Sequence, residues 1–325
     1  MEETTALRDA LLTRYGVRKT RRQKAAFADW AMACAAAMGL QARAEESGRL
    51  VRTRNIVFGD VDRAATLITA HYDTCARLLL PNVATPCSWI VFLLTQALLL
   101  AMIVLCGAVC GMLAAPLPGP LPVLIGVAAS AAVLALMLVG PANPHNANDN
   151  SSGVLLLLML LRALGDRPDV AFVLFDNEEK GLLGSAAFMG RHPRAARRFL
   201  LNLDCVGDGR TLLYTGSPAG LRCPQAKRLL AALEQLSAER GRQTASGAFP
   251  QVIYPSDQML FAHGTALAAL KGRRLLYLDR IHTARDVVLD MDNLELLREA
   301  IVQGLGASRD AVLKTGDRRA ATKGA

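Results

Sequence analysis

The middle of this sequence lacks charge. No Asp, Glu, Lys or Arg occurs among the 71 residues from 78 to 148, although the 325-residue chain carries 37 basic and 28 acidic side chains, a formal net charge of +9. The other 254 residues hold every charge, a charged fraction of about 26%, which is near that of an ordinary soluble domain. This distribution excludes a disordered chain and argues against a protein made of a soluble domain alone.

Other features are scarce or missing. Aromatic residues make up 5% of the chain, and its seven cysteines are odd in number with no CxxC pair, so neither a disulfide framework nor a cysteine-based structural zinc site is expected. Free cysteines favour a reducing compartment. The segment from Met1 to Asp9 is polar. Because it has no apolar core, we expect no secretory signal peptide.

The charge-free segment contains two long apolar runs, residues 88–114 and 121–140. Each reaches the length of about 20 residues that a helix needs to cross a bilayer. The proline-rich stretch 115–120 between them cannot continue a helix. The pattern predicts a transmembrane helical hairpin over 88–141 that contacts the lipid bilayer. The alternative is a pair of buried helices in a soluble core, but such helices usually keep a charged face.

A hairpin divides the chain into four parts and returns it to the side that it left. We expect residues 1–87 to form the N-terminal part of a catalytic α/β domain, beginning with a basic helical segment, and 142–308 to form the remainder. The basic tail 309–325 is expected to be disordered. The turn of the hairpin has no Lys or Arg, whereas Arg77 lies on the domain side, so the domain is expected to face the cytoplasm.

Six basic side chains cluster between Arg14 and Lys24. No aromatic residues alternate with them in a known nucleic-acid-binding pattern, so no nucleic acid is expected as a partner. A solvated helix face is the simplest interpretation, and attraction to an anionic membrane surface is another.

Outside the hairpin, short β-branched and aromatic runs alternate with helical patterns. This alternation predicts an α/β fold, a mostly parallel mixed sheet with helices on both faces. Strands are expected at 55–58, 65–70, 170–175, 199–203, 211–215 and 275–278. Helices are expected at 154–164, 181–189 and 225–239.

Metal-competent side chains follow several of these strands or open a helix. They are His71, Asp149, Glu178, Glu179, Asp204 and His282. In a parallel sheet, reactive groups gather at the carboxyl ends of the strands, and nitrogen and oxygen ligands of this kind suit two divalent cations. Each residue alone has an ordinary structural explanation, such as a helix cap or a solvated acidic pair, but the joint pattern does not. The remaining histidines, His145, His192 and His263, are expected to be structural.

The ordered segments that carry these residues resemble peptidase family M28, the dizinc aminopeptidases. The segments are ITAHYDT, NANDNSSG, FVLFDNEEKGLLGS, LLNLDCVG and IHTARD, with SDQMLFAHG (256–264) ahead of the last one. The resemblance covers residues 54–77 and 142–292. It implies a zinc-aminopeptidase-like α/β/α sandwich, a peptide substrate with a free N-terminus, and two Zn²⁺ ions, for which Co²⁺ or Mn²⁺ could substitute.

The resemblance also implies a role for each residue. His71 and Asp204 would hold one metal, Glu179 and His282 the other, and Asp149 would bridge them. Glu178 would be the general base, which takes a proton from the attacking water and passes it to the leaving amine. Asp73 would orient the His71 imidazole.

One departure from the family concerns the substrate. In soluble members the connection between the first histidine and the bridging aspartate is short, whereas here it contains the whole hairpin. We therefore expect the active site to open near the bilayer, which makes a membrane-proximal peptide or a lipid-like amide a conceivable substrate. Other activities on the same scaffold remain alternatives, namely a carboxypeptidase, a deacylase, a glutaminyl-cyclase-like transferase or a catalytically silent membrane scaffold. The cyclase is less favoured, because its single-zinc sites have Asp-Ser where this chain has Asp149-Asn150.

Overall fold

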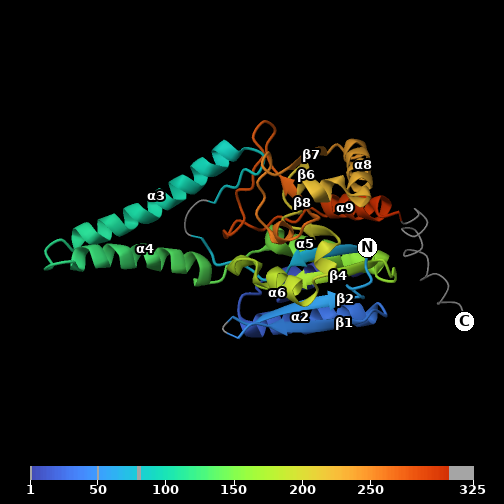
Figure 1. Ribbon diagram of the computed structural model, residues 1–325, viewed down its shortest axis with the longest axis horizontal. Helices are drawn as coiled ribbons and strands as arrows, with labels where there is room; N and C mark the ends of the chain where they lie inside the picture. The colour runs from blue at the N-terminus through green and yellow to red at the C-terminus, as the bar shows by residue number, and fades with distance from the viewer. Residues whose placement is uncertain (1, 50, 79–81, 307–325) are drawn as a thin grey trace, which may run out of the picture.

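The computed structural model describes residues 2–49, 51–78 and 82–306. The tail 309–325, which the sequence predicts to be disordered, lies outside the described residues. Figure 1 shows an α/β domain from which a long pair of helices, α3 and α4, projects to one side.

The domain is built on one eight-stranded sheet with the strand order β1-β2-β4-β3-β5-β8-β6-β7. The pairs β4–β3, β3–β5, β5–β8 and β6–β7 are parallel, whereas β1–β2, β2–β4 and β8–β6 are antiparallel. This mixed sheet agrees with the predicted α/β fold class. The strands span Ala42–Ser47 (β1), Thr53–Phe58 (β2), Thr66–His71 (β3), Val170–Phe175 (β4), Phe199–Leu203 (β5), Thr211–Gly216 (β6), Gln243–Ala248 (β7) and Gly264–Leu270 (β8).

Helices cover both faces of the sheet. Residues of β3 alternate between two cores: Ile68 belongs to the core that contains residues of α2, α5, α8 and α9, and Leu67 belongs to the core that contains Phe188 of α6. Helix α5 is buried along most of its length, which explains its nearly continuous leucine sequence. The helices of the domain span Glu2–Asp9 (α1), Arg21–Ala37 (α2), Gly153–Leu164 (α5), Leu183–Arg191 (α6), Pro218–Arg222 (α7), Pro224–Glu239 (α8) and Met291–Gly304 (α9). Shorter helical turns span Ala10–Arg14 (η1), Ala147–Ser152 (η2), Glu178–Lys180 (η3), Ala195–Arg197 (η4) and Asp257–Leu260 (η5).

One predicted strand is wrong. Residues 275–278 make only isolated bridges, Leu278 with Ala84 and Tyr277 with Lys271, and the strand beside β5 is β8 instead. The alanine-rich β8 has low β-propensity, yet it is buried between β5 and β6, so tertiary burial overrides the local preference. The edge strands β1 and β7 were not predicted, because their sequences are polar and lack β-branched alternation.

The hairpin helices α3 (Trp89–Leu113) and α4 (Leu121–Val139) match the two predicted apolar runs. Both are long and apolar enough to cross a membrane, and only 11% of the apolar window of α3 and 0% of that of α4 is buried. The pair is therefore not the core of the domain. The helices contact each other through small residues: a Cβ added at Gly107 would lie 2.6 Å from the carbonyl oxygen of Gly126, and one added at Gly111 would lie 2.9 Å from that of Pro122.

Candidate metal centre

The carboxyl ends of β4, β3 and β5 meet at one edge of the sheet. His71 is the last residue of β3, Asp204 directly follows β5, and the two glutamates of η3 come shortly after β4. Because these three strands are parallel neighbours, their ends bring the side chains together. Asp149 lies in η2, just before α5, and His282 lies in the loop between β8 and α9.

Asp149 lies between the two histidines. One of its carboxylate oxygens, Oδ1, is 3.3 Å from Nε2 of His71, and the other, Oδ2, is 3.0 Å from Nε2 of His282. Each histidine also faces a second carboxylate: His71 Nε2 is 3.6 Å from Asp204 Oδ1, and His282 Nε2 is 3.3 Å from Glu179 Oε2. The structure thus brings together all five residues that the sequence predicts as metal ligands.

Asp286 and Asn150 hold Asp149 in place. The backbone N–H groups of Asn148 and Asp149 donate to the two carboxylate oxygens of Asp286, at 2.8 and 3.0 Å. The side-chain amide of Asn150 donates to the carbonyl oxygens of His71 and Leu203, which ties this turn to β3 and β5. Asp286 lies within the IHTARD segment, but no role was predicted for it.

Asp73 connects the first histidine to the two glutamates. Its carboxylate oxygens accept hydrogen bonds from the backbone N–H groups of Glu178 (2.9 Å) and Glu179 (3.3 Å). Its Oδ1 lies 3.7 Å from Nδ1 of His71, and its carbonyl oxygen lies 3.2 Å from the same nitrogen. One side chain therefore positions both glutamates and faces the back of the imidazole.

The centre is strongly acidic and buried. Burial, together with the nearby Asp149 carboxylate, raises the pKa of Glu179 to about 8. Burial also raises the pKa of Glu178 well above its usual value, and Glu179 adds to the shift while His71 opposes it. For His282, burial lowers the pKa, but the Glu179 and Asp149 carboxylates outweigh it and raise the pKa to about 9. Buried carboxylates packed in this way repel one another and take up protons unless a cation compensates their charge.

The donor set fits zinc. Buried oxygens of two carboxylates, Oε1 of Glu179 and Oδ1 of Asp204, have no hydrogen-bond partner in the described part of the chain. Two imidazole Nε2 atoms also point at carboxylate oxygens rather than at neutral donors or acceptors. Nitrogen and oxygen ligands at such spacing are those that Zn²⁺ prefers, and a bound cation would satisfy these atoms.

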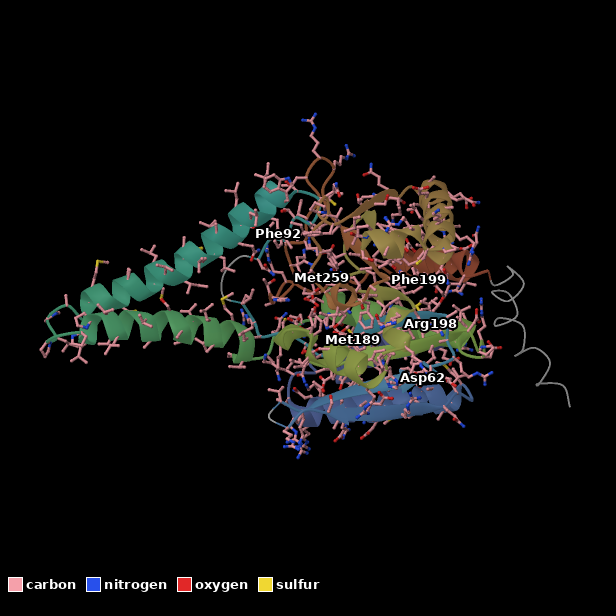
Figure 2. The ribbon with its side chains drawn as sticks, in the orientation of Figure 1. Asp62, Phe92, Met189, Arg198, Phe199 and Met259 are labelled. Atoms are coloured by element: carbon pink, nitrogen blue, oxygen red, sulfur yellow. The ribbon has the colours of Figure 1, made fainter. Side chains whose placement is uncertain are left out.

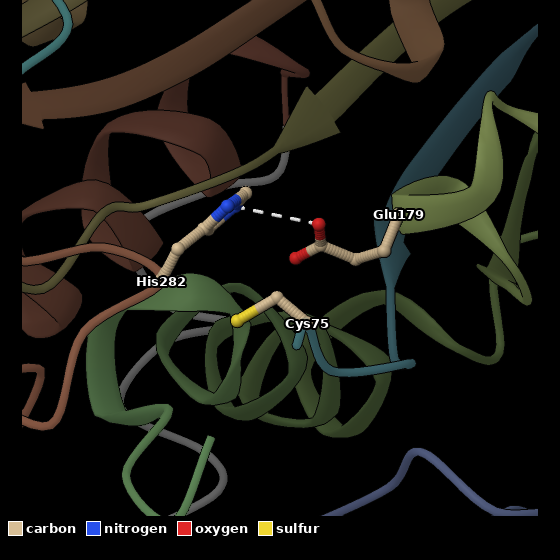
Figure 3. Close-up of side chains that lie close together, drawn as sticks. All are labelled: Cys75, Glu179 and His282. Atoms are coloured by element: carbon tan, nitrogen blue, oxygen red, sulfur yellow. Dashed lines mark ion pairs between the residues drawn. The ribbon is translucent and has the colours of Figure 1, made fainter. Parts of the chain in front are cut away.

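Cys75 is a further potential ligand that was not predicted. Its sulfur, the carboxylate of Glu179 and the imidazole of His282 lie within 4.8 Å of one another (Figure 3). Cys75 follows His71 by four residues, but nothing in that spacing distinguishes it from the other free cysteines. Of the histidines expected to be structural, His192 pairs with Glu45 at 2.9 Å and His263 lies beside Cys223.

Asp257 was also not given a role. It lies in η5, within the SDQMLFAHG segment, and is fully buried. Neither of its carboxylate oxygens makes a hydrogen bond to the described residues. Burial raises its pKa to about 7, with Asp73 and Asp204 adding to the shift while His71 opposes it. A second uncompensated carboxyl group therefore lies close to the centre.

The basic cluster between Arg14 and Lys24 is not simply the solvated helix face that was expected. Arg18 is fully buried and donates to the carbonyl oxygens of Tyr15 and Tyr72 and to Oγ of Ser151, so it links the N-terminal segment to the ends of β3 and η2. Burial lowers its pKa to about 10, although Asp73 and Asp149 partly offset the effect. Arg18 and Lys24 are therefore buried, whereas Arg14, Arg21 and Arg22 are exposed, as a solvated face predicts.

Lys24 forms a buried ion pair with Asp176, at 2.6 Å, at the start of the loop that carries the two glutamates. Replacing Lys24 by methionine leaves a buried carboxylate without its partner. We expect Lys24→Met to lower the free energy of unfolding by about 3–5 kcal/mol, which a thermal or denaturant melt would measure. The control is Arg22→Ala, because Arg22 lies two residues away and is exposed. Equal stability of the two variants would contradict this interpretation.

A cavity of about 260 Å³ opens onto the centre. Its lining includes the two histidines and the carboxylates of the centre, together with the apolar side chains of Ile253, Leu278 and Pro86. Two residues of α3, Phe92 and Gln96, also line the cavity. The hairpin thus contributes directly to the space above the predicted ligands.

Comparisons with known proteins identify the family and the fold. The model of peptidase family M28 matches residues 132–302, which is more than half of the chain. No curated protein matches. Among solved structures, a zinc-dependent exopeptidase from Parabacteroides distasonis has a TM-score of 0.61 at 16% identity, over 95% of this chain and 98% of that one.

Two other structures have the same fold. A glutaminyl cyclase from Porphyromonas gingivalis has a TM-score of 0.58 at 19% identity, over 93% of this chain and 96% of that one. A leucine aminopeptidase precursor from Bacteroides thetaiotaomicron has a TM-score of 0.57 at 16% identity, over 94% of this chain and 95% of that one. At these identities the likeness concerns the fold.

Proposed function

The chain is a member of peptidase family M28, a family of zinc-dependent hydrolases, and we propose that it is a two-zinc aminopeptidase anchored in a membrane by the α3–α4 hairpin. The observation that carries the proposal is the position of Asp149, whose two carboxylate oxygens each face a different histidine. A single carboxylate placed between two histidines in this way could be shared by two metal ions, each of which one histidine would also hold.

In this proposal His71 and Asp204 would hold one ion, Glu179 and His282 would hold the other, and Asp149 would be shared by both. When bound, the ions polarise the scissile carbonyl and activate the attacking water. The unpartnered oxygens of Glu179 and Asp204 support their assignment as ligands. Because the site is rich in carboxylates, it attracts the ammonium group of a peptide's free N-terminus.

Glu178 is the proposed general base. It takes a proton from the attacking water on a carboxylate oxygen and donates it to the nitrogen of the departing amine. Burial raises its pKa, which makes it a better proton acceptor, and the hydrogen bond from its backbone N–H to Asp73 fixes the start of its side chain. Asp73 also faces His71 Nδ1, so it is the proposed positioning residue for the imidazole.

Two matched peptides test the proposed activity. One has a free N-terminus and the other is N-acetylated, and the products are identified by mass spectrometry with and without a chelator. We expect residues to be released one at a time from the free peptide only, and we expect chelation to stop the reaction and added zinc to restore it. Release from the C-terminus, removal of the N-acetyl group, or loss of ammonia from an N-terminal glutamine would favour the carboxypeptidase, deacylase or cyclase alternative, respectively. No reaction by zinc-loaded protein would favour a silent scaffold.

The hairpin supports the membrane anchor. Its helices expose large apolar side chains along their length, including Leu94, Leu98 and Val123 at more than half of their surface. The Gly107-x-x-x-Gly111 spacing on α3 packs against Gly126 and Ser130 of α4, and small residues at this spacing allow close approach of membrane helices. A soluble protein rarely leaves an apolar surface of this size uncovered.

The orientation that we propose places the catalytic domain in the cytoplasm. The turn between α3 and α4 has no Lys or Arg. On the domain side, Lys19 donates a hydrogen bond to the carbonyl oxygen of Leu138 near the end of α4, at 3.1 Å, and Arg77 lies just before the hairpin. Basic residues at the cytoplasmic ends of membrane helices agree with this orientation.

Removing residues 88–140 and joining the ends with a short Gly-Ser linker is expected to convert the protein from a membrane-bound to a soluble form. The two helices carry the exposed apolar surface, whereas the domain has its own cores. Fractionation of cells that express the full chain and the deletion variant measures the change. If the deletion variant remains in the membrane fraction after a carbonate wash, the hairpin is not the anchor.

A further inference from the structure

Helix α3 supplies part of the wall of the catalytic cavity. Phe92 and Gln96 line the same cavity as the predicted metal ligands and Glu178. They are four residues apart, so they lie on one face of α3, and both belong to its first turns after Trp89. Figure 2 shows Phe92 at the end of α3 that meets the domain. The same helix therefore enters the proposed membrane segment and borders the proposed active site.

Gln96 carries the only side-chain amide in α3. The helix is otherwise dominated by aliphatic residues, and a primary amide within such a segment is energetically costly. Its amide makes no hydrogen bond to any described residue, while the neighbouring Thr95 donates to the carbonyl oxygen of Phe92. An amide that faces the cavity offers one donor group and one acceptor, which are the groups that pair with a peptide backbone.

The remaining walls of the cavity are largely apolar. Ile253 and Tyr254 line this cavity and also a second pocket of about 280 Å³, whose lining includes the exposed side chains of Phe249 and Met259. The helices α3 and α4 touch around Gly107 and separate toward the domain (Figure 1). A peptide that extends from the centre toward the second pocket or along α3 therefore meets apolar surface.

We propose that Phe92 and Gln96 bind the substrate, and that the substrate is the free amino end of a peptide whose following segment is apolar and held at the bilayer. This inference rests on the proposed aminopeptidase function. Gln96 pairs with the peptide backbone near the scissile bond, and Phe92 packs against an apolar side chain. The hairpin then serves both as an anchor and as a selectivity element that favours membrane-held over freely soluble peptides.

The test compares two substrates with the same first three residues in full-length protein reconstituted in vesicles. One is a short soluble peptide, and the other continues into an apolar segment that partitions into the same vesicles. For the unmodified protein we expect kcat/KM, expressed per total peptide, to be at least roughly tenfold higher for the vesicle-bound peptide. Failure to hydrolyse either peptide would contradict the proposed function. Equal kcat/KM for the two would overturn only the inference.

Phe92→Ala and Gln96→Leu test the two residues. We expect each to reduce kcat/KM for the vesicle-bound peptide at least roughly tenfold, mainly through KM, with a smaller loss for the short peptide. The matched control is Leu94→Ala on the same helix, because Leu94 is exposed and is not among the residues that line the cavity. If both variants behave as Leu94→Ala does, the inference is wrong.

A cross-linking measurement does not depend on these variants. A vesicle-bound peptide with a photoreactive group at its third residue is added to zinc-loaded Glu178→Gln protein, which is expected to bind it without hydrolysis. We expect the label within residues 88–100, identified by mass spectrometry, and competition by unlabelled peptide. Specific labelling that is confined to other segments would contradict a substrate-binding role for α3.

Discussion

Replacing Glu178 by glutamine is expected to reduce kcat by roughly 10²–10⁴-fold, the contribution that a positioned general base typically makes. Glutamine has nearly the same shape as glutamate but cannot accept the proton of the attacking water. The backbone hydrogen bonds that Asp73 accepts from the two glutamates do not involve the altered group, so the loop should keep its conformation. Steady-state hydrolysis of an aminoacyl anilide measures the loss.

The zinc content of two variants distinguishes the assignment of Glu178 as the base and Glu179 as a ligand from the reverse assignment. Glu178 has no assigned metal in our proposal, so the Glu178→Gln protein should bind as much zinc as the unmodified protein. The comparison variant is Glu179→Gln, which should lose zinc as well as activity. If Glu178→Gln loses zinc while Glu179→Gln retains it, the base and the ligand have been assigned the wrong way round.

Replacing Asp149 by alanine is expected to abolish activity and to release both ions. Its two oxygens face Nε2 of His71 and of His282, and no other carboxylate in the described part of the chain lies within 4 Å of both nitrogens. By contrast, Asp204→Ala and Glu179→Ala each remove a ligand from one side of the centre and should leave about one zinc per chain. Metal analysis of the purified variants gives this pattern directly.

Stability measurements show whether Asp149→Ala acts through the metal or through the fold. Asp149 raises the pKa of the neighbouring Glu179, which reflects repulsion between buried carboxylates in the absence of metal. Burial also disfavours the charged form of Asp149, but His71 and His282 attract its carboxylate more strongly and hold its pKa well below the usual range. The metal-free Asp149→Ala protein should therefore melt below the metal-free unmodified protein, and zinc should stabilise only the latter. The control is Asp62→Ala, since Asp62 is 62% exposed and distant from the hairpin (Figure 2). If zinc raised the melting temperature of Asp149→Ala as much as that of the unmodified protein, Asp149 would not be a metal ligand.

The sequence predicts the parts of this protein that depend on local pattern. The charge-free runs predict α3 and α4 because an apolar sequence of that length has a strong and local signature. The strand-end residues His71 and Asp204 are predicted to be neighbours because a parallel sheet brings its carboxyl ends to one edge. The chemical roles of these residues remain proposals.

Features that depend on distant contacts have no such signature. Arg18 belongs to a run of basic residues, yet it is buried because three acceptors from separate segments surround it. Gln96 lies in a segment that was interpreted only as an anchor, and its position beside the catalytic cavity depends on the angle at which α3 leaves the domain. Cys75 likewise approaches His282 only through the folding of the intervening chain.

The most direct test of the central proposal is a zinc titration of metal-free, full-length protein, in which bound zinc and aminoacyl anilide hydrolysis are measured on the same samples. A two-zinc aminopeptidase predicts that full activity requires two ions per chain and that chelation reverses it. Full activity with a single bound ion would contradict the role of Asp149 as a bridging ligand. Two bound ions without hydrolysis of any free N-terminus would contradict the aminopeptidase function itself.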